Sequence, residues 1–273
     1  MSTRSSITKL LVANRGEIAR RVFATCRDMG IRTVAVYSEP DRTAPFVVEA
    51  DEGVALGGAA PAESYLRGDA VIAAAVRVGA DAIHPGYGFL AENPGFAQAV
   101  VDAGLVWVGP SPEAMRTMGS KLASKRLMNE VGVPTLESID LSGVTDDAIS
   151  AAAEELGYPV LVKASAGGGG KGMQIVADPN GLLEAVAAGR RQAGSAFGDD
   201  TVFLERYLDG PRHIEIQVFG DAAGNIVSLF ERECSIQRRH QKIVEESPSM
   251  ALDEATRQKM GEAAIAAARA VDY

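Results

Sequence analysis

Short runs of β-branched and apolar residues alternate with longer amphipathic stretches from Lys9 onward. The strand-like runs are LLVAN, IRTVAVYS, DAIHP and LVWVG, and the stretches GEIARRVFATCRDMG and DAVIAAAVRVGA have helical spacing. Such alternation predicts a βαβα order and a parallel sheet covered by helices. The fold class is therefore α/β, at least for this part of the chain.

The first amphipathic stretch predicts a helix directly after the first strand. Apolar residues recur at helical spacing, namely Ile18, Val22, Cys26 and Met29. We expect these side chains to form a buried face, and Gly30 to end the helix at its C′ position. A helix N-terminus at this edge of a parallel sheet can hold an anion, but the segment lacks the GxGxxG pattern, so a dinucleotide site is not favoured.

The pattern changes around Pro110 to Glu113, where we place a domain boundary. A helix over AMRTMGSKLASKRLMNEVG follows, and then a strand, helix, strand, glycine loop and strand, which predict a small lid subdomain. Three strands with alternating polarity come next, VFLERYL, HIEIQVFGD and NIVSLFERECSIQ, the last two joined by a turn at DAAGN. A helix from Asp253 to Val271 has an apolar side that needs a partner surface. That side comprises Met260, Ala263, Ala264, Ala267 and Val271.

Composition excludes several classes of protein. The chain is 47% hydrophobic, which argues against wholesale disorder, and 27 Lys and Arg face 36 Asp and Glu, a net charge of −9 that argues against nucleic-acid binding. Cys26 and Cys234 lie far apart, which excludes a disulfide framework or a familiar zinc module. The N-terminal apolar run is too short for a signal peptide, and no run approaches the ~20 residues of a membrane span. We therefore expect a cytoplasmic protein with no membrane role.

Four consecutive glycines, Gly167 to Gly170, lie between the strand-like runs PVLVK and MQIV. Backbone without Cβ atoms lets successive N–H groups approach phosphate oxygens, and Lys163 on the entering strand would add a positive charge. The segment is not a Walker A motif, because a strand rather than a helix follows and Met173 replaces Ser or Thr. A flexible hairpin tip is the alternative.

Charged residues crowd in the segment ERECSIQRRHQKIVEESPS. We expect Cys234, Ile236 and Ile243 to anchor it, while Gln237, His240 and Lys242 project polar groups. A convergent set of cations suits an anionic substrate, although mixed charges also occur on ordinary solvated surfaces. On the preceding strand, a polar face is formed by His213, Glu215 and Gln217, which indicates a wet cleft.

The segment HPGYGFLAEN follows a predicted parallel strand. Gly86 and Gly88 imply a tight turn that presents Tyr87 and Phe89 at the carboxyl end of the sheet, where ligands of open α/β sheets bind. His84 itself is more readily explained as a structural residue than as a substrate contact.

In combination, these motifs resemble the biotin carboxylase family. The blocks LLVANRGEIA, HPGYGFLAEN, MGSK, KASAGGGGKGM, FLERYL, PRHIEIQV and ERECSIQRRHQK occur in the family's order from Lys9 to about Pro248. One departure is Ala91, where the family usually has Ser. The resemblance implies a Rossmann-like pre-ATP-grasp domain over residues 1–115. An ATP-grasp domain would follow over residues 116–273, with its lid at about 135–205 and its C-terminal side missing.

The resemblance also implies roles for individual residues. Lys121 and Lys163 would bind ATP phosphates, and Lys242 would bind bicarbonate and act in catalysis with His240. The other implied contacts are Gly169 and Gly170 in the closing lid, Glu205, Arg206, Tyr207 and Leu208 around adenine, His213, Gln237 and His240 along the ribose and phosphates, and Tyr87 beside biotin.

The implied reaction is the carboxylation of carrier-linked biotin with ATP and bicarbonate, with Mg²⁺ as the metal cofactor. Its partners would be a biotin carboxyl carrier protein or domain, a carboxyltransferase subunit and a second copy of the chain. We expect the family's two metal-binding glutamates, its catalytic arginine and its C-terminal domain to follow residue 273, so that these 273 residues alone have little or no carboxylase activity. Two alternatives stay open, a non-catalytic nucleotide-binding or assembly module and another ATP-grasp carboxylate ligase.

Overall fold

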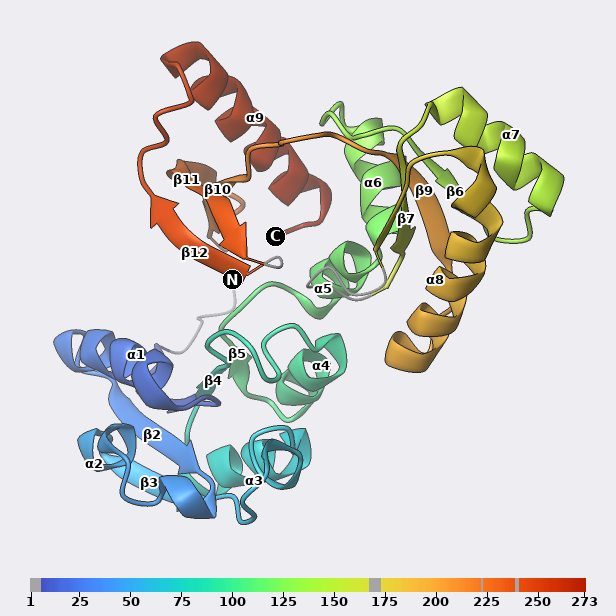
Figure 1. Cartoon of the computed structure of the whole chain (residues 1–273). Helices are drawn as coiled ribbons and strands as arrows, with labels where there is room; N and C mark the ends of the chain where they lie inside the picture. Colours follow the sequence, from blue (N-terminus) through green and yellow to red (C-terminus); the bar gives the residue numbers. More distant parts are fainter. Residues whose placement is uncertain (1–5, 167–172, 222, 239–240) are drawn as a thin grey trace. The chain divides into compact units, whose positions relative to one another are not determined.

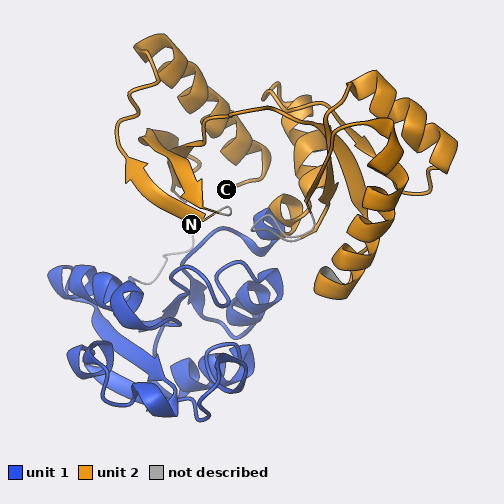
Figure 2. Cartoon of the chain, in the orientation of Figure 1, with its two compact units in different colours: residues 1–115 blue, residues 116–273 orange. Residues whose placement is uncertain are grey.

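The structure is a computed structural model that describes residues 6–166, 173–221, 223–238 and 241–273. The chain divides into two compact units, residues 1–115 and residues 116–273 (Figure 2). None of the helices in the described ranges is both long and apolar enough to span a bilayer.

The first unit has the predicted alternation of strands and helices (Figure 1). Its elements are β1 (Lys9–Val12), α1 (Gly16–Asp28), β2 (Arg32–Tyr37), α2 (Pro45–Glu49), β3 (Glu52–Ala55), α3 (Gly68–Val78), β4 (Ala82–His84), α4 (Pro94–Asp102) and β5 (Val106–Trp107), with 3₁₀ turns at Glu39–Asp41 and Pro61–Glu63. The strand order is β3-β2-β1-β4-β5, and every pairing is parallel. The parallel sheet predicted from the sequence is therefore confirmed.

Hydrophobic clusters cover both faces of this sheet, as an all-parallel sheet requires. On α1 the fully buried residues are Ala19, Phe23 and Cys26, whereas Met29 is 67% exposed. The buried face of α1 is therefore rotated from the predicted one. It includes Cys26 as predicted, but it is centred on Phe23 and excludes Met29. Gly30 follows the helix with φ +70°, as the predicted helix stop requires.

The second unit begins with two helices where the sequence pattern predicted one. Its elements are α5 (Pro112–Gly119, which starts in the first unit), α6 (Lys121–Glu130), β6 (Ser138–Asp140), α7 (Asp146–Leu156), β7 (Val160–Ala164), β8 (Gln174–Val176), a 3₁₀ turn (Pro179–Gly181), α8 (Leu182–Phe197), β9 (Val202–Arg206), β10 (Ile214–Gly220), β11 (Ile226–Arg238), β12 (Gln241–Glu246) and α9 (Glu254–Ala270). The prediction of one helix was wrong because Ser120 is extended and caps α6, its hydroxyl accepting the N–H of Ala123 at 3.3 Å.

A four-stranded sheet in the order β6-β9-β7-β8 forms the core of the lid region. One face packs against α7 and α8 through a hydrophobic cluster that includes Val160, Val162 and Leu204. Side chains alternate along strands, so Lys163, opposite Phe203 on β9, belongs to the other face. In Figure 1 α6 lies beside that second face.

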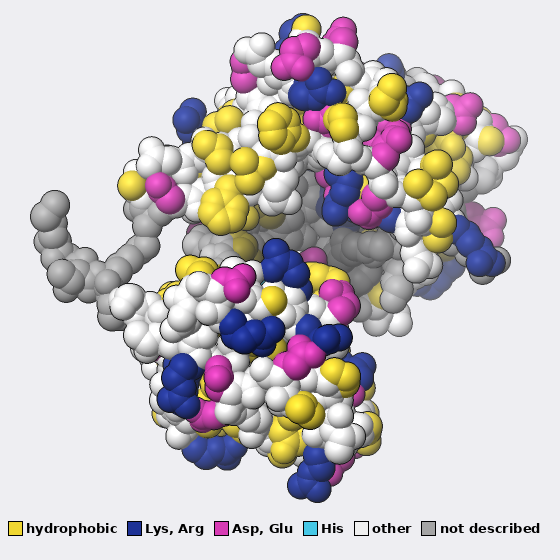
Figure 3. All heavy atoms as spheres, turned by 90° about the vertical axis from the view of Figure 1, so that its left-hand side faces the viewer, with side chains coloured by type: hydrophobic (Ala, Val, Ile, Leu, Met, Phe, Trp, Pro, Cys, Tyr) yellow, Lys and Arg dark blue, Asp and Glu magenta, His cyan; other side chains and the backbone are white. Residues whose placement is uncertain are grey.

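A three-stranded antiparallel sheet, β10-β11-β12, carries α9 on one face. The hairpin at Asp221–Asn225 joins β10 and β11 as predicted. Cys234 is buried, but Ile236 and Ile243 are 61% and 57% exposed, so the prediction that these isoleucines anchor the segment was wrong. The hydrophobic side chains that Figure 3 shows on the surface of the second unit are consistent with a sheet that is packed on one face.

Candidate functional site

The first group of candidate residues is built on the N-terminus of α6. Lys121 is the first residue of this helix, and its Nζ donates to the carbonyl oxygens of Ala164, Ser165 and Ala166 at 3.2 to 3.4 Å. Its backbone N–H donates to the Ser165 carbonyl at 3.1 Å. The Lys121 ammonium is therefore fixed at the chain that leads into the glycine-rich segment.

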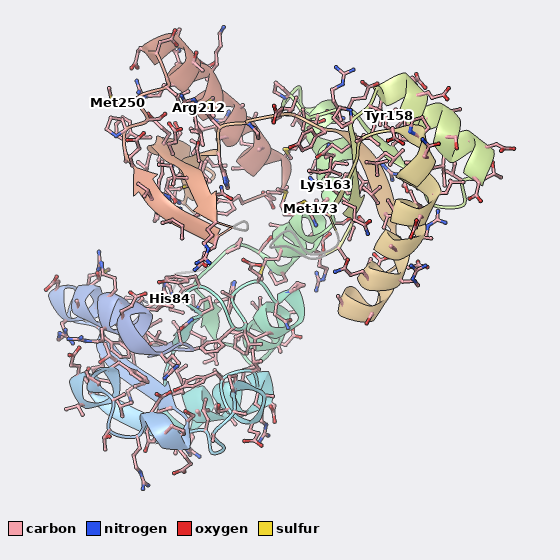
Figure 4. All side chains as sticks on the ribbon, in the orientation of Figure 1. His84, Tyr158, Lys163, Met173, Arg212 and Met250 are labelled. Atoms are coloured by element: carbon pink, nitrogen blue, oxygen red, sulfur yellow. The ribbon has the colours of Figure 1, made fainter. Side chains whose placement is uncertain are left out.

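Lys163 and Glu205 meet on the sheet face that does not pack against α7 and α8. Lys163 Nζ on β7 donates to Glu205 Oε2 on β9 at 2.8 Å (Lys163 is labelled in Figure 4). The second oxygen, Oε1, lies 2.5 Å from Nζ of Lys125, one helical turn after Lys121. The two ammonium groups also lie 5.7 and 5.8 Å from the ring centroid of the buried Phe203.

Within this group the ammonium groups of Lys125 and Lys163 both pair with the Glu205 carboxylate, and Lys121 lies near enough for Lys163 to affect its pKa. Burial raises the pKa of Glu205, but hydrogen bonds from Lys125 and Lys163 outweigh that effect and hold the pKa below its ordinary value. Burial lowers the pKa of Lys121, and the nearby Lys163 ammonium lowers it further. An additional anion would relieve this repulsion, so the group is suited to phosphate oxygens.

The glycine-rich segment joins two paired strands. β7 and β8 are antiparallel, with Val160 opposite Val176, which confirms that a strand and not a helix follows the glycines. Gly169 and Gly170 lie outside the described residues. β9 ends at Arg206 and leads into Tyr207, whose N–H donates to the Pro159 carbonyl at 3.4 Å, and then into an exposed Leu208.

A second group is centred on Glu215 of β10. Its Oε2 accepts a hydrogen bond from Arg232 Nη2 of β11 at 2.5 Å, and its Oε1 forms a short contact with Nζ of Lys242 on β12. Arg232 also reaches Glu245 at 3.3 Å. Burial raises the pKa of Glu215, yet the two cations outweigh it and lower the pKa to about 2. Glu215 is therefore ionised at neutral pH and holds Lys242 in place.

His213 and Gln237 lie beside this carboxylate. The Gln237 Nε2 amide is 2.7 Å from His213 Nδ1 and donates to the Cys234 carbonyl at 2.8 Å. Because an amide nitrogen only donates, we assign Nδ1 as the acceptor, which leaves the ring proton on Nε2, 3.5 Å from Glu215. His240 lies outside the described residues.

Tyr87 belongs to the first unit, on the turn after β4. The Asn14 side chain at the end of β1 donates to the carbonyl oxygens of Pro85 and Tyr87, both at 2.8 Å. The Tyr87 hydroxyl contacts Glu17 of α1, and its ring is largely exposed. β1 and β4 are neighbours at the point where the strand order reverses, the usual ligand position in such sheets. The half-buried His84 accepts the Gly86 N–H at 2.9 Å, and burial lowers its pKa.

Two charged residues of the site were not identified as such from the sequence. Lys125 was read only as part of a helix, although its i+4 spacing from Lys121 places both on one helix face. Glu215 was placed on the polar face of its strand but given no role. Their importance comes from partners on other elements, which a local pattern does not contain.

Mg²⁺ has no site among the residues that the structure describes. No three His, Cys, Asp or Glu side chains in these ranges come together in a way that could hold a metal ion. The described residues do not fit the metal that the resemblance implies, and no step is assigned to a metal held by them.

Comparison with known proteins adds to this geometry. Residues 6–115 match the family model of the biotin carboxylase N-terminal domain, and residues 120–273 match that of the carbamoyl-phosphate synthase L chain ATP binding domain. The second match and the antiparallel sheets define the second unit as an ATP-binding domain of the ATP-grasp class. The chain belongs to the biotin carboxylase family.

Relatives and solved structures agree with that assignment. The chain is 50% identical to biotin carboxylase of Halalkalibacterium halodurans (97% of this chain, 59% of the relative) and 52% identical to the mitochondrial methylcrotonoyl-CoA carboxylase subunit alpha of Dictyostelium discoideum (98% and 38%). A crystal structure of a biotin carboxylase–β,γ-ATP complex from Campylobacter jejuni is similar with TM-score 0.94, 46% identity and coverage of 98% and 60%. The chain thus spans less than two thirds of the length of these relatives.

Proposed function

We propose that the protein containing this chain is the biotin carboxylase component of an acyl-CoA carboxylase. The observation that carries the proposal is the placement of Lys121 and Lys163 at the chain that enters the glycine-rich segment, where Lys163 pairs with Glu205, and where burial together with Lys163 lowers the pKa of Lys121. Two neighbouring cations at this position suit the polyphosphate of ATP. The biotin carboxylase–β,γ-ATP complex and a Hydrogenobacter thermophilus 2-oxoglutarate carboxylase domain bound to MgADP and bicarbonate support the choice of ligands.

In the proposed site, Lys121 and Lys163 bind ATP phosphates, with Gly169 and Gly170 closing over them. The segment from Glu205 to Leu208, which spans the end of β9, borders adenine, as in the family that the motifs resemble. To bind phosphate, Lys121 would exchange its carbonyl partners for phosphate oxygens. That exchange is favourable for an ammonium group that lies beside a second cation.

The second group, around Glu215, binds bicarbonate and borders the nucleotide. Lys242 binds the bicarbonate anion, and His213, Gln237 and His240 line the ribose and phosphate region. A bicarbonate oxygen attacks the γ-phosphorus and ADP leaves, which gives carboxyphosphate. Carboxyphosphate then breaks into CO₂ and phosphate, the released phosphate takes the proton from N1′ of biotin, and N1′ attacks CO₂. We assign Tyr87 to the biotin ring. Fixed cations stabilise the charge that develops during phosphoryl transfer.

The proposal includes the partners that this chemistry requires. A biotin carrier protein or domain delivers the biotin, a carboxyltransferase consumes carboxybiotin, and Mg²⁺ binds together with ATP. Homodimer formation and a cytoplasmic location, where ATP and bicarbonate are both available, belong to the same proposal.

Phosphate release from ATP by the full-length protein tests this function. We expect release that depends on bicarbonate and rises when biotin or a biotinylated carrier is added. ATP cleavage without bicarbonate would point to another ATP-grasp ligase, and ATP binding without any cleavage would point to a non-catalytic module. Either result would overturn the proposal.

Lys242→Ala tests the bicarbonate assignment separately. We expect the KM for bicarbonate to rise by about tenfold or more, the size of one lost charge-assisted contact, while the Kd for ATP changes by less than about threefold. An equal loss of bicarbonate use and ATP binding would argue against the assigned role. Lys259→Ala, at an exposed lysine of α9, is the control and should change neither constant.

A further inference from the structure

Lys125 has no part in the binding roles described above, yet it makes one of the closest charged contacts in the lid region. Its Nζ lies 2.5 Å from Oε1 of Glu205, and its side chain is largely buried. It follows Lys121 by four residues, so α6 presents both ammonium groups on the same face. One helix therefore supplies one cation at the glycine-rich segment and a second at the carboxylate that also holds Lys163.

Glu205 divides its two oxygens between two cations. Oε2 takes Lys163 at 2.8 Å and Oε1 takes Lys125 at 2.5 Å, while the Phe203 ring lies near both ammonium groups. A buried carboxylate must stay paired, because an unpaired buried charge is strongly destabilising. If Lys163 were its only partner, Lys163 would leave Glu205 uncompensated whenever it turned to another anion.

We propose that Lys125 is a positioning residue that keeps Glu205 paired while Lys163 exchanges this carboxylate for a nucleotide phosphate. The inference rests on the proposed function and deepens it. Lys125 acts through Glu205 and Lys163 and does not itself contact the nucleotide. Lys125 lowers the free-energy cost of separating Lys163 from Glu205. Its effect is therefore specific to ligands that carry phosphate groups.

Isothermal titration calorimetry of the full-length protein, without bicarbonate so that no turnover occurs, tests the inference with three ligands. We expect Lys125→Met to weaken ATP and ADP binding by about tenfold and to change adenosine binding by less than about twofold. Lys125→Arg, which keeps the charge, should stay within about threefold of the unsubstituted protein for all three ligands. Lys259→Met on α9 is the matched control for loss of a lysine charge and should have no effect.

A double substitution separates positioning from a structural role. Glu205→Gln keeps the side chain's size and removes the charge that Lys125 is inferred to balance, so adding Lys125→Met to Glu205→Gln should cost less than about twofold in ATP affinity. If Lys125→Met yields no folded protein, Lys125→Gln replaces it with the same expected results.

Three results would overturn the inference. They are unchanged ATP binding in Lys125→Met, an equal loss of adenosine and ATP binding, and an undiminished loss in the Glu205→Gln background. Failure of the unsubstituted protein to bind ATP would overturn both the inference and the proposed function. ATP binding without bicarbonate-dependent cleavage would overturn only the proposed function, so the two failures are distinguishable.

Discussion

Arg257 of α9 donates its Nε–H to both carboxylate oxygens of Glu231 on β11, each at 2.9 Å. The Glu231 side chain is fully buried, and the N–H of Ser249 donates to the same carboxylate at 3.1 Å. Burial raises the pKa of Glu231, but the bonds from Arg257 and Ser249 outweigh it and lower the pKa. This carboxylate therefore joins a strand, the loop after β12 and the final helix.

Arg257→Met should destabilise the second unit, because it leaves the Glu231 carboxylate buried without its cation. Removing one partner of a buried ion pair destabilises the protein strongly, because the remaining charge is buried without a partner. The intact pair itself adds much less to stability. We expect Tm to fall by at least about 5 °C in a thermal unfolding measurement.

The matched control changes the other partner of the same arginine. Glu254 accepts a hydrogen bond from Arg257 Nη1 at 2.8 Å, but its side chain is 85% exposed. Glu254→Gln should therefore lower Tm by less than about 2 °C, as for other exposed ion pairs. Equal shifts in the two variants would show that burial of Glu231 does not determine the stability of this contact.

The turn that presents Tyr87 contains two glycines with positive φ in different surroundings. At Gly86 (φ +66°) an added Cβ would lie 2.6 Å from Ile18 Cγ2 and 2.7 Å from Asn14 Nδ2, whereas at Gly88 (φ +72°) it would meet nothing within 4 Å. Gly88→Ala should cost only the conformational strain, about 1 kcal/mol. Gly86→Ala adds a steric clash and should cost about 3 kcal/mol in the free energy of unfolding.

The free energy of unfolding of the first unit, measured in urea, distinguishes the two glycine variants. A cost of Gly86→Ala no greater than that of Gly88→Ala would mean that Ile18 and Asn14 move aside freely. In that case the hydrogen bonds from Asn14 would not hold the turn rigidly.

Tyr158 has a buried hydroxyl that finds no hydrogen-bond partner among the described residues. Burial raises the pKa of this phenol, with Glu154 and Asp178 contributing in the same direction. Tyr158→Phe removes only that oxygen, so the free energy of unfolding should stay within about 0.5 kcal/mol or rise by up to about 1 kcal/mol. A loss of more than about 1 kcal/mol in urea unfolding would show that the hydroxyl is paired in solution.

Local sequence patterns correctly predicted several of the helices, strands and turns. The elements β1, α1, β2, α3, β4 and β5 of the first unit follow from periodicity, and the structure confirms them. The hairpin at Asp221–Asn225 and the final helix are confirmed as well. The polar face shared by His213 and Glu215 also followed from alternation. These features depend on neighbours within a few residues, which is the range that such patterns report.

Features that depend on packing between distant segments were missed. The elements α2, β3, α4, α8 and β12 were not predicted. Ile236 and Ile243 were expected to anchor their segment, whereas both are exposed. Only the structure shows that α9 lies on one face of this sheet. Likewise, Lys125 became part of the site because α6 places it beside Glu205, a contact between residues that are far apart in the sequence.

Glu215 provides the clearest pH-dependent prediction. Its pKa is lowered from 4.5 to about 2 in the folded protein by Lys242 and Arg232, against the opposing effect of burial. As pH falls below about 4.5, the unfolded chain takes up a proton at this position while the folded protein does not, so stability declines until the folded pKa is reached. The contribution is fully present above pH 4.5 and is lost as the pH falls through about 2.

Glu215→Gln removes that proton uptake. Between about pH 5 and about pH 3, the free energy of unfolding in urea should fall with pH less steeply in Glu215→Gln than in the unsubstituted protein, by up to about 1.4 kcal/mol per pH unit. Glu262→Gln, at an exposed carboxylate of α9, is the control and should keep the original slope. Identical slopes in all three proteins would mean that Lys242 and Arg232 do not lower the pKa of Glu215. The charge network proposed to hold Lys242 for bicarbonate would then have to be abandoned.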